Sequence, residues 1–118
     1  MKRIDYFDKA INDKCNLGDC DINHTLFLAY RKSLEVNNDT IDFNDIIWEY
    51  DIDPIVTDCR KYGIETITIS CNFSGLTSTL WELSQRGCTL VGTKIVKAPY
   101  KDIITHEFAK IPALIIKL

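Results

Sequence analysis

The sequence predicts a single domain of the α/β (α+β) class, in which N-terminal helices pack on a small mixed β-sheet. Residues 64–70 (IETITIS) alternate apolar and polar side chains and are rich in β-branched residues, which is typical of a half-buried strand. Leu76, Leu80 and Leu83 follow at helical spacing, and Gly87 is suited to end that helix. A chain of 118 residues is long enough for one domain with one hydrophobic core, so we expect residues 1–118 to form it.

The first half of the chain is predicted to be mainly helical. Apolar residues at helical spacing predict helices over 4–12, 22–35 and 54–62. The candidate N-caps are Asp19 or Asp21 for the second helix and Asp51 or Asp53 for the third. Pro54 is tolerated in a first turn, where its missing N–H has no partner to lose, and Gly63 ends the third helix.

The second half predicts a sheet built from residues 64–70, 88–97 and 111–118, with 41–43 as a candidate short edge strand. A helix between the first two of these strands predicts a right-handed βαβ unit with the strands parallel. Pro99 and residues 100–102 are expected to interrupt the strand over 88–97, before a connection of about a dozen residues to the C-terminal strand. The continuous apolar run of that last strand predicts burial on both faces and an antiparallel course.

Composition excludes several classes of protein. No apolar run reaches the roughly 18 residues of a membrane span. The first residues carry charges where a signal peptide would need an apolar segment. We therefore expect a cytoplasmic protein with no membrane partner. Five cysteines, an odd number in a chain without an export signal, indicate reduced thiols rather than a disulfide framework.

Charge is distributed unevenly along the chain. The interval 33–59 holds eight acidic residues and no basic one. Phosphate contacts need Lys and Arg, so no nucleic acid is expected at that surface. The acidic 35–58 segment is instead a candidate contact face for a basic protein partner. The residues proposed for that contact are Asp42, Asp45, Glu49, Asp51 and Asp53. A homo-oligomer formed through an exposed strand edge at 41–43 or 111–118 is left open.

A second candidate site follows the 64–70 strand. Cys71, Asn72, Ser74 and Gly75 lie where a strand ends and a helix begins, a position that favours anionic ligands and lowers the pKa of a thiol. A nucleophile there would need a histidine beside it. The simpler interpretation is that Ser74 caps the helix and Gly75 allows close packing. Four aromatic residues are interpreted as core or semi-buried anchors rather than a stacking platform: Trp48, Trp81, Tyr30 and Tyr100.

Metal and cofactor motifs are weak. Cys15, Cys20 and His24 have the spacing C-x4-C-x3-H, with Cys71 as a conceivable fourth ligand, but structural zinc sites use tighter pairs. Neither a GxGxxG nor a GxxxxGK[ST] phosphate loop occurs, and the acidic residues do not follow the calcium-loop pattern. We therefore expect neither a metal nor a cofactor.

Two resemblances extend this interpretation. The chain resembles a family of small uncharacterised proteins of gut Gram-positive bacteria, often encoded in conjugative mobile elements. The motifs that carry the resemblance are MKRIDYF at the start, Asp42-Phe43, Ile47-Trp48-Glu49, ISCNFSGL over 69–76 and KIPAL over 110–114. That family has no assigned activity, so the resemblance implies a genetic setting and no mechanism.

The second resemblance covers residues 64–118. The strand followed by Asn72, a helix, Arg86-Gly87-Cys88, Val91-Gly92, Tyr100 and a final apolar strand are similar to the C-terminal half of GCN5-related N-acetyltransferases. The resemblance implies roles in acetyl transfer for Asn72 and Tyr100. The chain departs from that family by lacking its Q/R-x-x-G-x-G/A cofactor loop and four N-terminal strands, and by placing Cys88 where an aromatic residue is usual.

The sequence thus favours a non-enzymatic accessory or interaction protein of mobile elements that uses the acidic segment. The alternative is a divergent or degenerate acyltransferase-like enzyme that binds an anionic ligand around Cys71, Asn72, Ser74, Gly75 and Tyr100. A third hypothesis, a mimic of DNA charge, is disfavoured by the basic C-terminal half.

Overall fold

The computed structural model describes residues 23–118. The expected helix over 4–12, the caps Asp19 and Asp21, and Cys15 and Cys20 lie outside the described residues. The elements in order are α2 (His24–Glu35), β1 (Ile41–Phe43), α3 (Glu49–Lys61), β2 (Thr66–Ile69), α4 (Leu76–Gln85), β3 (Thr89–Lys101) and β4 (Phe108–Lys117). This arrangement confirms the predicted α+β class with a mixed sheet.

The four strands form one sheet in the order β1-β2-β4-β3. β1 and β2 are parallel neighbours joined by α3, which makes them a βαβ unit. The expected parallel course of 64–70 and 88–97 is confirmed, because β2 and β3 are both antiparallel to β4 and are joined by α4. The two strands are not neighbours, however, since β4 lies between them. The predicted edge strand over 41–43 is confirmed at the end of the sheet.

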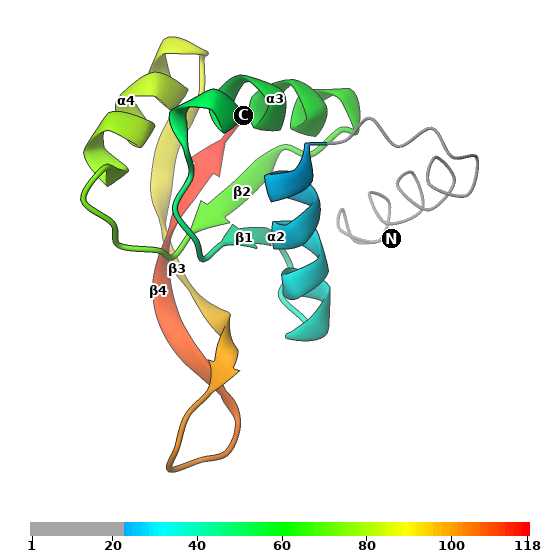
Figure 1. Ribbon diagram of the computed structural model, residues 1–118, viewed down its shortest axis with the longest axis vertical. Helices are drawn as coiled ribbons and strands as arrows, with labels where there is room; N and C mark the ends of the chain where they lie inside the picture. The colour runs from blue at the N-terminus through cyan, green and yellow to red at the C-terminus, as the bar shows by residue number, and fades with distance from the viewer. Residues whose placement is uncertain (1–22) are drawn as a thin grey trace.

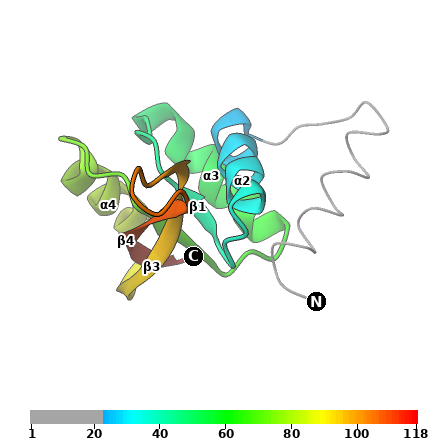
Figure 2. The same cartoon turned by 90° about the horizontal axis from the view of Figure 1, so that it is seen from below.

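Helices α3 and α4 lie side by side over one face of the sheet (Figure 1). The view along the β3–β4 hairpin also places both helices on the same side of the sheet (Figure 2). Strand residues that point toward these helices form the centre of the core. They include Ile41, Phe43, Ile67, Ile69 and Ile116, and they share one buried cluster with Ile52, Ile55, Val56 and Cys59 of α3 and Leu83 of α4. Alternate strand residues supply this face because the side-chain period of a strand is two.

Helix α2 packs beside β1 and covers part of the outer edge of that strand. The Asp42 backbone N–H, which points away from β2, donates to the Ser33 hydroxyl of α2 at 2.9 Å. The 41–43 edge is therefore partly covered by α2. Of the second proposed edge, residues 114–117 lie between β2 and β3, whereas residues 111–113 pair with β3 alone.

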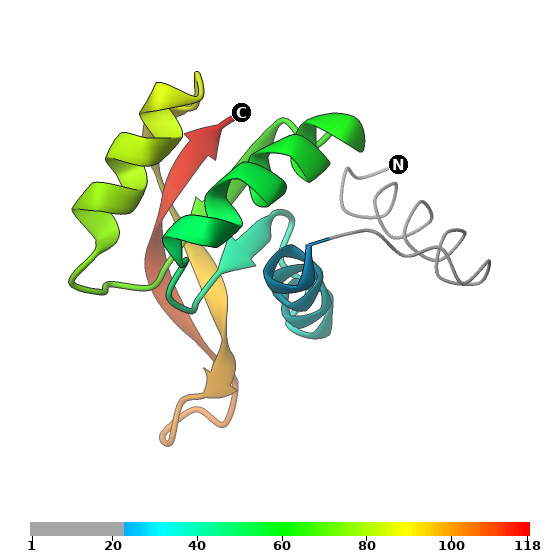
Figure 3. The same ribbon diagram turned by 45° about the horizontal axis from the view of Figure 1, so that its top comes forward.

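The β3–β4 hairpin continues well past β2. Only Leu114–Lys117 of β4 pairs with β2, so the remainder of the hairpin, residues 94–113, forms a two-stranded arm that projects from the body (Figures 1 and 3). The long connection expected after Pro99 is wrong, because only 102–107 separate the strands. Pro99 lies in a register irregularity, and Pro112 lies where β4 has no β2 neighbour, so neither proline removes a hydrogen bond that the sheet needs.

The predicted burial of β4 on both faces is also wrong. Of its residues, only Ala113 and Ile116 are buried, while Leu114 is partly buried against the core. The apolar run has a helical layer on one face, and the opposite face stays partly open. Among residues 23–118, no helix combines the length and the apolarity that crossing a bilayer requires.

Two helices begin at residues that differ from the expected ones. α2 is capped by Asn23, whose side-chain oxygen accepts from the Leu26 N–H at 3.0 Å. α3 begins at Glu49, earlier than the expected cap at Asp51 or Asp53, so Pro54 lies inside the helix. The ends at Gly63 and Gly87 are confirmed, since both adopt positive φ angles of 74° and 81°, which glycine favours.

The early start of α3 follows from tertiary contacts of Asp51. Its carboxylate accepts from the Asn23 side-chain amide at 3.0 Å and from the Thr25 hydroxyl at 2.8 Å. Asp51 therefore joins the first turn of α3 to the start of α2, and it is buried there instead of capping its own helix.

Candidate functional site: a cleft between α3 and α4

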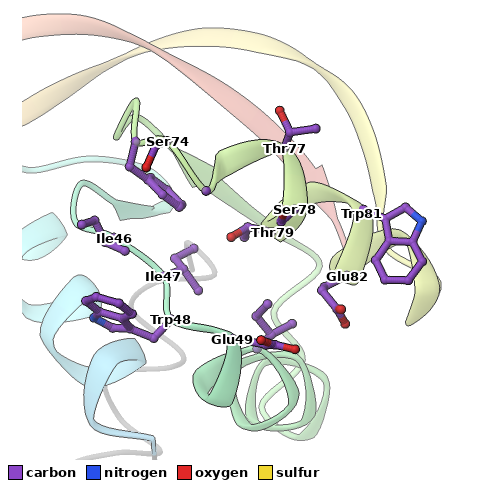
Figure 4. A pocket seen from close by; sticks show the side chains of 13 residues that line it. Ile46, Ile47, Trp48, Glu49, Ser74, Thr77, Ser78, Thr79, Trp81 and Glu82 are labelled. Atoms are coloured by element: carbon purple, nitrogen blue, oxygen red, sulfur yellow. The ribbon is translucent and has the colours of Figure 1, made fainter.

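A cleft of about 740 Å³ opens between α3 and α4 (Figure 4). Its walls come from the loops that follow β1 and β2 and from the helices into which those loops lead. Ligands of α/β proteins commonly bind at this position, outside the carboxyl ends of parallel strands. A concave, mainly apolar site of this size with a few polar groups is typical of a binding pocket.

Aromatic and aliphatic side chains dominate the cleft. Trp48 stands at the start of α3 and Trp81 on α4, and their exposed fractions are 55% and 59%. Neither tryptophan belongs to the core, so of the interpretation as core or semi-buried anchors only the second part fits them, whereas Tyr30 is fully buried. Trp81 lies off the helical stripe of Leu76, Leu80 and Leu83, and that offset was the sequence signal that could have revealed its exposure. The other large apolar residues of the cleft are Ile46, Ile47, Ile52 and Phe73.

The charged groups of the cleft are all acidic. Glu49 comes from α3 and Glu82 from α4, and no lysine, arginine or histidine lines the space. The Arg86 guanidinium bonds the Glu82 carboxylate at 2.7 Å and also pairs with Asp53, which ties α4 to α3 behind the cleft. The Arg86 hydrogen bond holds the pKa of the Asp53 carboxyl below its ordinary value.

The candidate ligand residues after the 64–70 strand are only partly brought together. Ser74 and Gly75 line the cleft, whereas Cys71 and Asn72 precede them in the loop and do not. Tyr100 lies exposed on the arm and does not line the cleft either. The structure therefore does not assemble the pair that the acyltransferase resemblance implies. Ser74 does not cap α4, because Gly75 occupies the N-cap position and no side chain bonds the helix end.

The three cysteines among the described residues are free, and the pKa of each thiol is raised. Partial burial raises the pKa of Cys71, and the Asp45 and Asp42 carboxylates raise it further, so the expected lowering by a helix end is wrong. Burial raises the pKa of Cys59 to about 12 and also raises that of Cys88. Neither described histidine supplies a base, since His24 begins α2 and His106 lies in the turn of the arm.

The five acidic residues proposed as a contact face do not share a surface. Asp42 and Asp51 are buried, so neither is available to a partner. Asp45 is exposed and pairs with Lys32 at 2.8 Å, and exposed Asp53 pairs with Arg86. Glu49 is the member that lines the cleft. Spacing alone could not separate these roles, because each depends on what the fold places beside the carboxylate.

Asp42 organises a buried polar network instead. Its two carboxylate oxygens accept from the Thr68 hydroxyl at 2.7 Å and from the Ser70 hydroxyl at 2.6 Å. The Asn44 side-chain amide donates to Ser70 at 2.8 Å. Burial raises the pKa of Asp42, and the two hydroxyl bonds oppose that rise. The network joins β1 to β2 on the face of the sheet opposite α3 and α4, which gives it a structural role.

Metal ligation finds no support among residues 23–118, in which no three His, Cys, Asp or Glu side chains gather around a common point. The Cys15 and Cys20 members of the C-x4-C-x3-H pattern lie outside this part of the chain. The groups that the cleft offers a ligand are apolar walls, acidic side chains and the hydroxyls of Ser74, Thr77, Ser78 and Thr79.

Comparison with known proteins places this fold in a family. A family model described as "Domain of unknown function (DUF7698)" matches residues 25–118, which include nearly all of α2 and every later element. No curated protein and no solved structure was found to match the chain. The prediction of an uncharacterised family is confirmed by the family model. Because the match covers most of the sequence, the chain belongs to the DUF7698 family of domains of unknown function.

Proposed function

We propose that this protein is a non-enzymatic, cytoplasmic accessory protein of bacterial mobile elements, and that its cleft between α3 and α4 binds a basic, apolar segment of a protein partner. One observation carries the proposal. The cleft combines two half-exposed tryptophans with two carboxylates, and none of its lining residues is a cation.

The aromatic residues supply the contact area. Trp48 and Trp81 expose large apolar surfaces beside a concave space that also contains Phe73. Tryptophan is enriched among the residues that dominate the energy of protein–protein contacts, because it buries a large area at a small cost in conformational entropy. Exposed apolar surface that is rimmed by polar groups commonly marks an interaction site.

The carboxylates supply the preference for a basic segment. Glu49 adds a negative charge to the cleft, whereas the Glu82 carboxylate is bound to Arg86. A lysine or arginine that approached Glu49 would also come near Trp48 at the start of the same helix. Such cation–π contacts contribute roughly 0.5–2 kcal/mol, depending on how far the cation is desolvated. The acidic residues therefore contribute through the cleft rather than as a continuous face.

A second candidate is the acyltransferase-like enzyme. It is favoured by the position of the cleft, since α3 and α4 both begin beside it and helix N-termini attract anions. The charges oppose it, because the phosphates of a coenzyme A ester would meet Glu49 and Glu82 without any lysine or arginine in the lining. The raised pKa of Cys71 also disfavours a thiolate nucleophile there.

The two candidates are separated by titrating the protein with a library of short peptides that combine Lys or Arg with aliphatic residues, and separately with acetyl-CoA. We expect peptide binding that Trp48→Ala and Glu49→Lys each weaken by roughly tenfold or more. Tyr50→Ala and Glu35→Lys are the matched controls, since both residues are exposed and neither lines the cleft. Binding of acetyl-CoA without any peptide binding would overturn the proposal in favour of the enzyme.

A further inference from the structure

The turn of the arm presents two isoleucines almost completely to solvent. Ile103 and Ile104 are 90% and 88% exposed, and they belong to the turn that connects β3 to β4. This turn is the end of the hairpin farthest from the body (Figure 1). Tyr100, close to the same end, is more than half exposed as well. Single exposed apolar residues are ordinary, but adjacent isoleucines at the end of a projecting hairpin form an apolar tip that typically serves a contact.

The tip is ordered by its own hydrogen bonds. The Asp102 backbone N–H donates to the Glu107 carbonyl at 2.7 Å. The Asp102 carboxylate accepts from the backbone N–H groups of Ile104 at 2.8 Å and Thr105 at 3.1 Å. Because these bonds fix the backbone of the turn, the isoleucines are held outward in advance of any contact. Such preorganisation lowers the entropic cost of binding.

The arm is also fixed to the body. The Asn38 side chain donates to the Lys97 carbonyl and accepts from the Lys97 N–H, both at 2.9 Å, so it occupies the outer edge of β3 like a short piece of strand. The arm then leads away from α3 and α4, and its tip lies at the opposite end of the molecule from the top of these helices (Figures 1 and 3). The tip therefore cannot enter the cleft of its own chain.

The arm and the cleft have complementary chemistry. The arm carries Lys94, Lys97, Lys101 and Lys110 against the two acidic residues Asp102 and Glu107. The cleft is apolar, contains Glu49 and Glu82, and has no basic residue in its lining. The turn itself holds Asp102, whose carboxylate accepts from the turn backbone, and Glu107, so the basic charge of the arm comes from Lys101 beside the turn and from lysines nearer the body. The apolar tip and these lysines are the groups that an apolar, acidic cleft is suited to hold, and the chain carries both halves of the contact.

We propose that the tip of the arm of one copy occupies the cleft between α3 and α4 of a second copy. The inference rests on the proposed function, which assigns basic and apolar segments to the cleft, and it names the arm of this same protein as an occupant. Two copies that exchange arms reciprocally form both contacts at once and close the assembly as a dimer. A competing contact is edge-to-edge pairing of β3, whose exposed apolar residues are Leu90, Val91 and Ile95.

Sedimentation of the full chain over a concentration series tests the proposal. We expect wild-type dimers, and we expect the double variant Ile103→Asp/Ile104→Asp and the double variant Trp48→Ala/Glu49→Lys each to be monomeric. The decisive measurement mixes the two variants. The first retains an intact cleft and the second an intact arm, so the mixture regains one of the two contacts and forms a heterodimer. Ile95→Ser is the matched arm control and should dimerise like the wild type.

Several outcomes would overturn the inference: a monomeric wild type at its highest soluble concentration, a tip variant that still dimerises, or a mixture that stays monomeric. Loss of the dimer in Ile95→Ser would instead assign the contact to the edge of β3. The proposed function is read separately, by titrating the basic peptide library into the monomeric tip variant, whose cleft is unoccupied by an arm. If the cleft binds peptides but the wild type forms no dimer, only the arm-exchanged dimer is overturned. If the wild type forms dimers but the cleft binds no peptide, only the proposed binding of a partner's basic segment is overturned.

Discussion

The two ends of β4 lie in very different surroundings. Residues Leu114–Lys117 pair with β2 on one side and β3 on the other, and Ile116 is buried in the core beneath the helices. Residues 108–112 of the same strand pair with β3 alone and form half of the arm. The inner end is held by burial of apolar surface, whereas the outer end is held by backbone pairing, the Asp102 turn and the Asn38 tether.

This difference separates stability from function along one hairpin. The free energy of folding comes mainly from apolar burial, so substitutions in the body should be costly. Within the arm, Val96, Ala98 and Ala113 are buried, but the turn at its end buries little apolar surface and can carry exposed isoleucines without weakening the fold. Function-bearing segments are often placed in this way on a rigid scaffold.

The largest expected difference between the body and the arm is in how much an alanine substitution lowers the free energy of unfolding. Ile67→Ala removes a side chain with no exposed surface at the centre of the core and should lower the free energy of unfolding by about 2–5 kcal/mol. Ile103→Ala at the tip should change it by less than about 0.5 kcal/mol. Urea denaturation of the two variants measures both values. Similar losses in both would contradict the division into a buried body and a peripheral arm.

An intermediate effect is expected where the arm meets the body. Asn38→Ala leaves the N–H and the carbonyl of Lys97 without their side-chain partner, at a cost of about 1–3 kcal/mol. Hydrogen exchange of the Lys97 amide should accelerate more than that of amides in β2, because the arm loosens locally. Asn72→Ala is the control, since Asn72 is exposed in a loop. Equal acceleration across the whole sheet would show that the arm and the body unfold together.

The smallest effect is a pH dependence inside the body. Because burial raises the folded pKa of Asp42, the folded state binds more protons than the unfolded state just above the ordinary Asp value of 3.8. The contribution of Asp42 to stability therefore falls as the pH rises from that value through the folded pKa. Asp42→Asn removes this contribution, so the stability of the wild type relative to the variant should decrease from acid to neutral pH.

Denaturation of the wild type and of Asp42→Asn at several pH values from acid to neutral measures the difference between their free energies of unfolding. Asp45→Asn is the control, because Asp45 is exposed and pairs only with Lys32 among the described residues. A relative stability that stays constant with pH, or that rises toward neutral pH, would contradict the raised pKa of Asp42.

Local patterns predicted much of the secondary structure. Three elements follow from the periodicity or backbone preference of neighbouring residues: the 64–70 strand, the helix that ends at Gly87 and the short 41–43 strand. Errors arose where a distant partner decided the outcome. Asp51 entered a helix instead of capping it because Asn23 and Thr25 offered its carboxylate hydrogen bonds. Pro99 did not end β3 because it falls at an irregularity of the pairing.

The candidate site was less accessible to prediction than the fold. Ser74, Gly75 and Glu49 were singled out from the sequence and do line the cleft, but they had been assigned to two separate sites. Tyr100 was placed with Asn72 by resemblance, yet the arm carries it out of the cleft. Trp81 was missed as a surface group, although its offset from the stripe of Leu76, Leu80 and Leu83 indicated the exposed side of the helix.

The sequence by itself determined which segments are helices and strands, the α+β class and the polarity of each segment, because these properties follow from neighbouring residues. Only the tertiary structure decided that β4 inserts between β2 and β3, that Asp42 and Asp51 are buried, and that the two loops after β1 and β2 frame one cleft. The reason is physical: strand order and burial minimise the free energy of the whole chain, and no local pattern records which distant surfaces will meet.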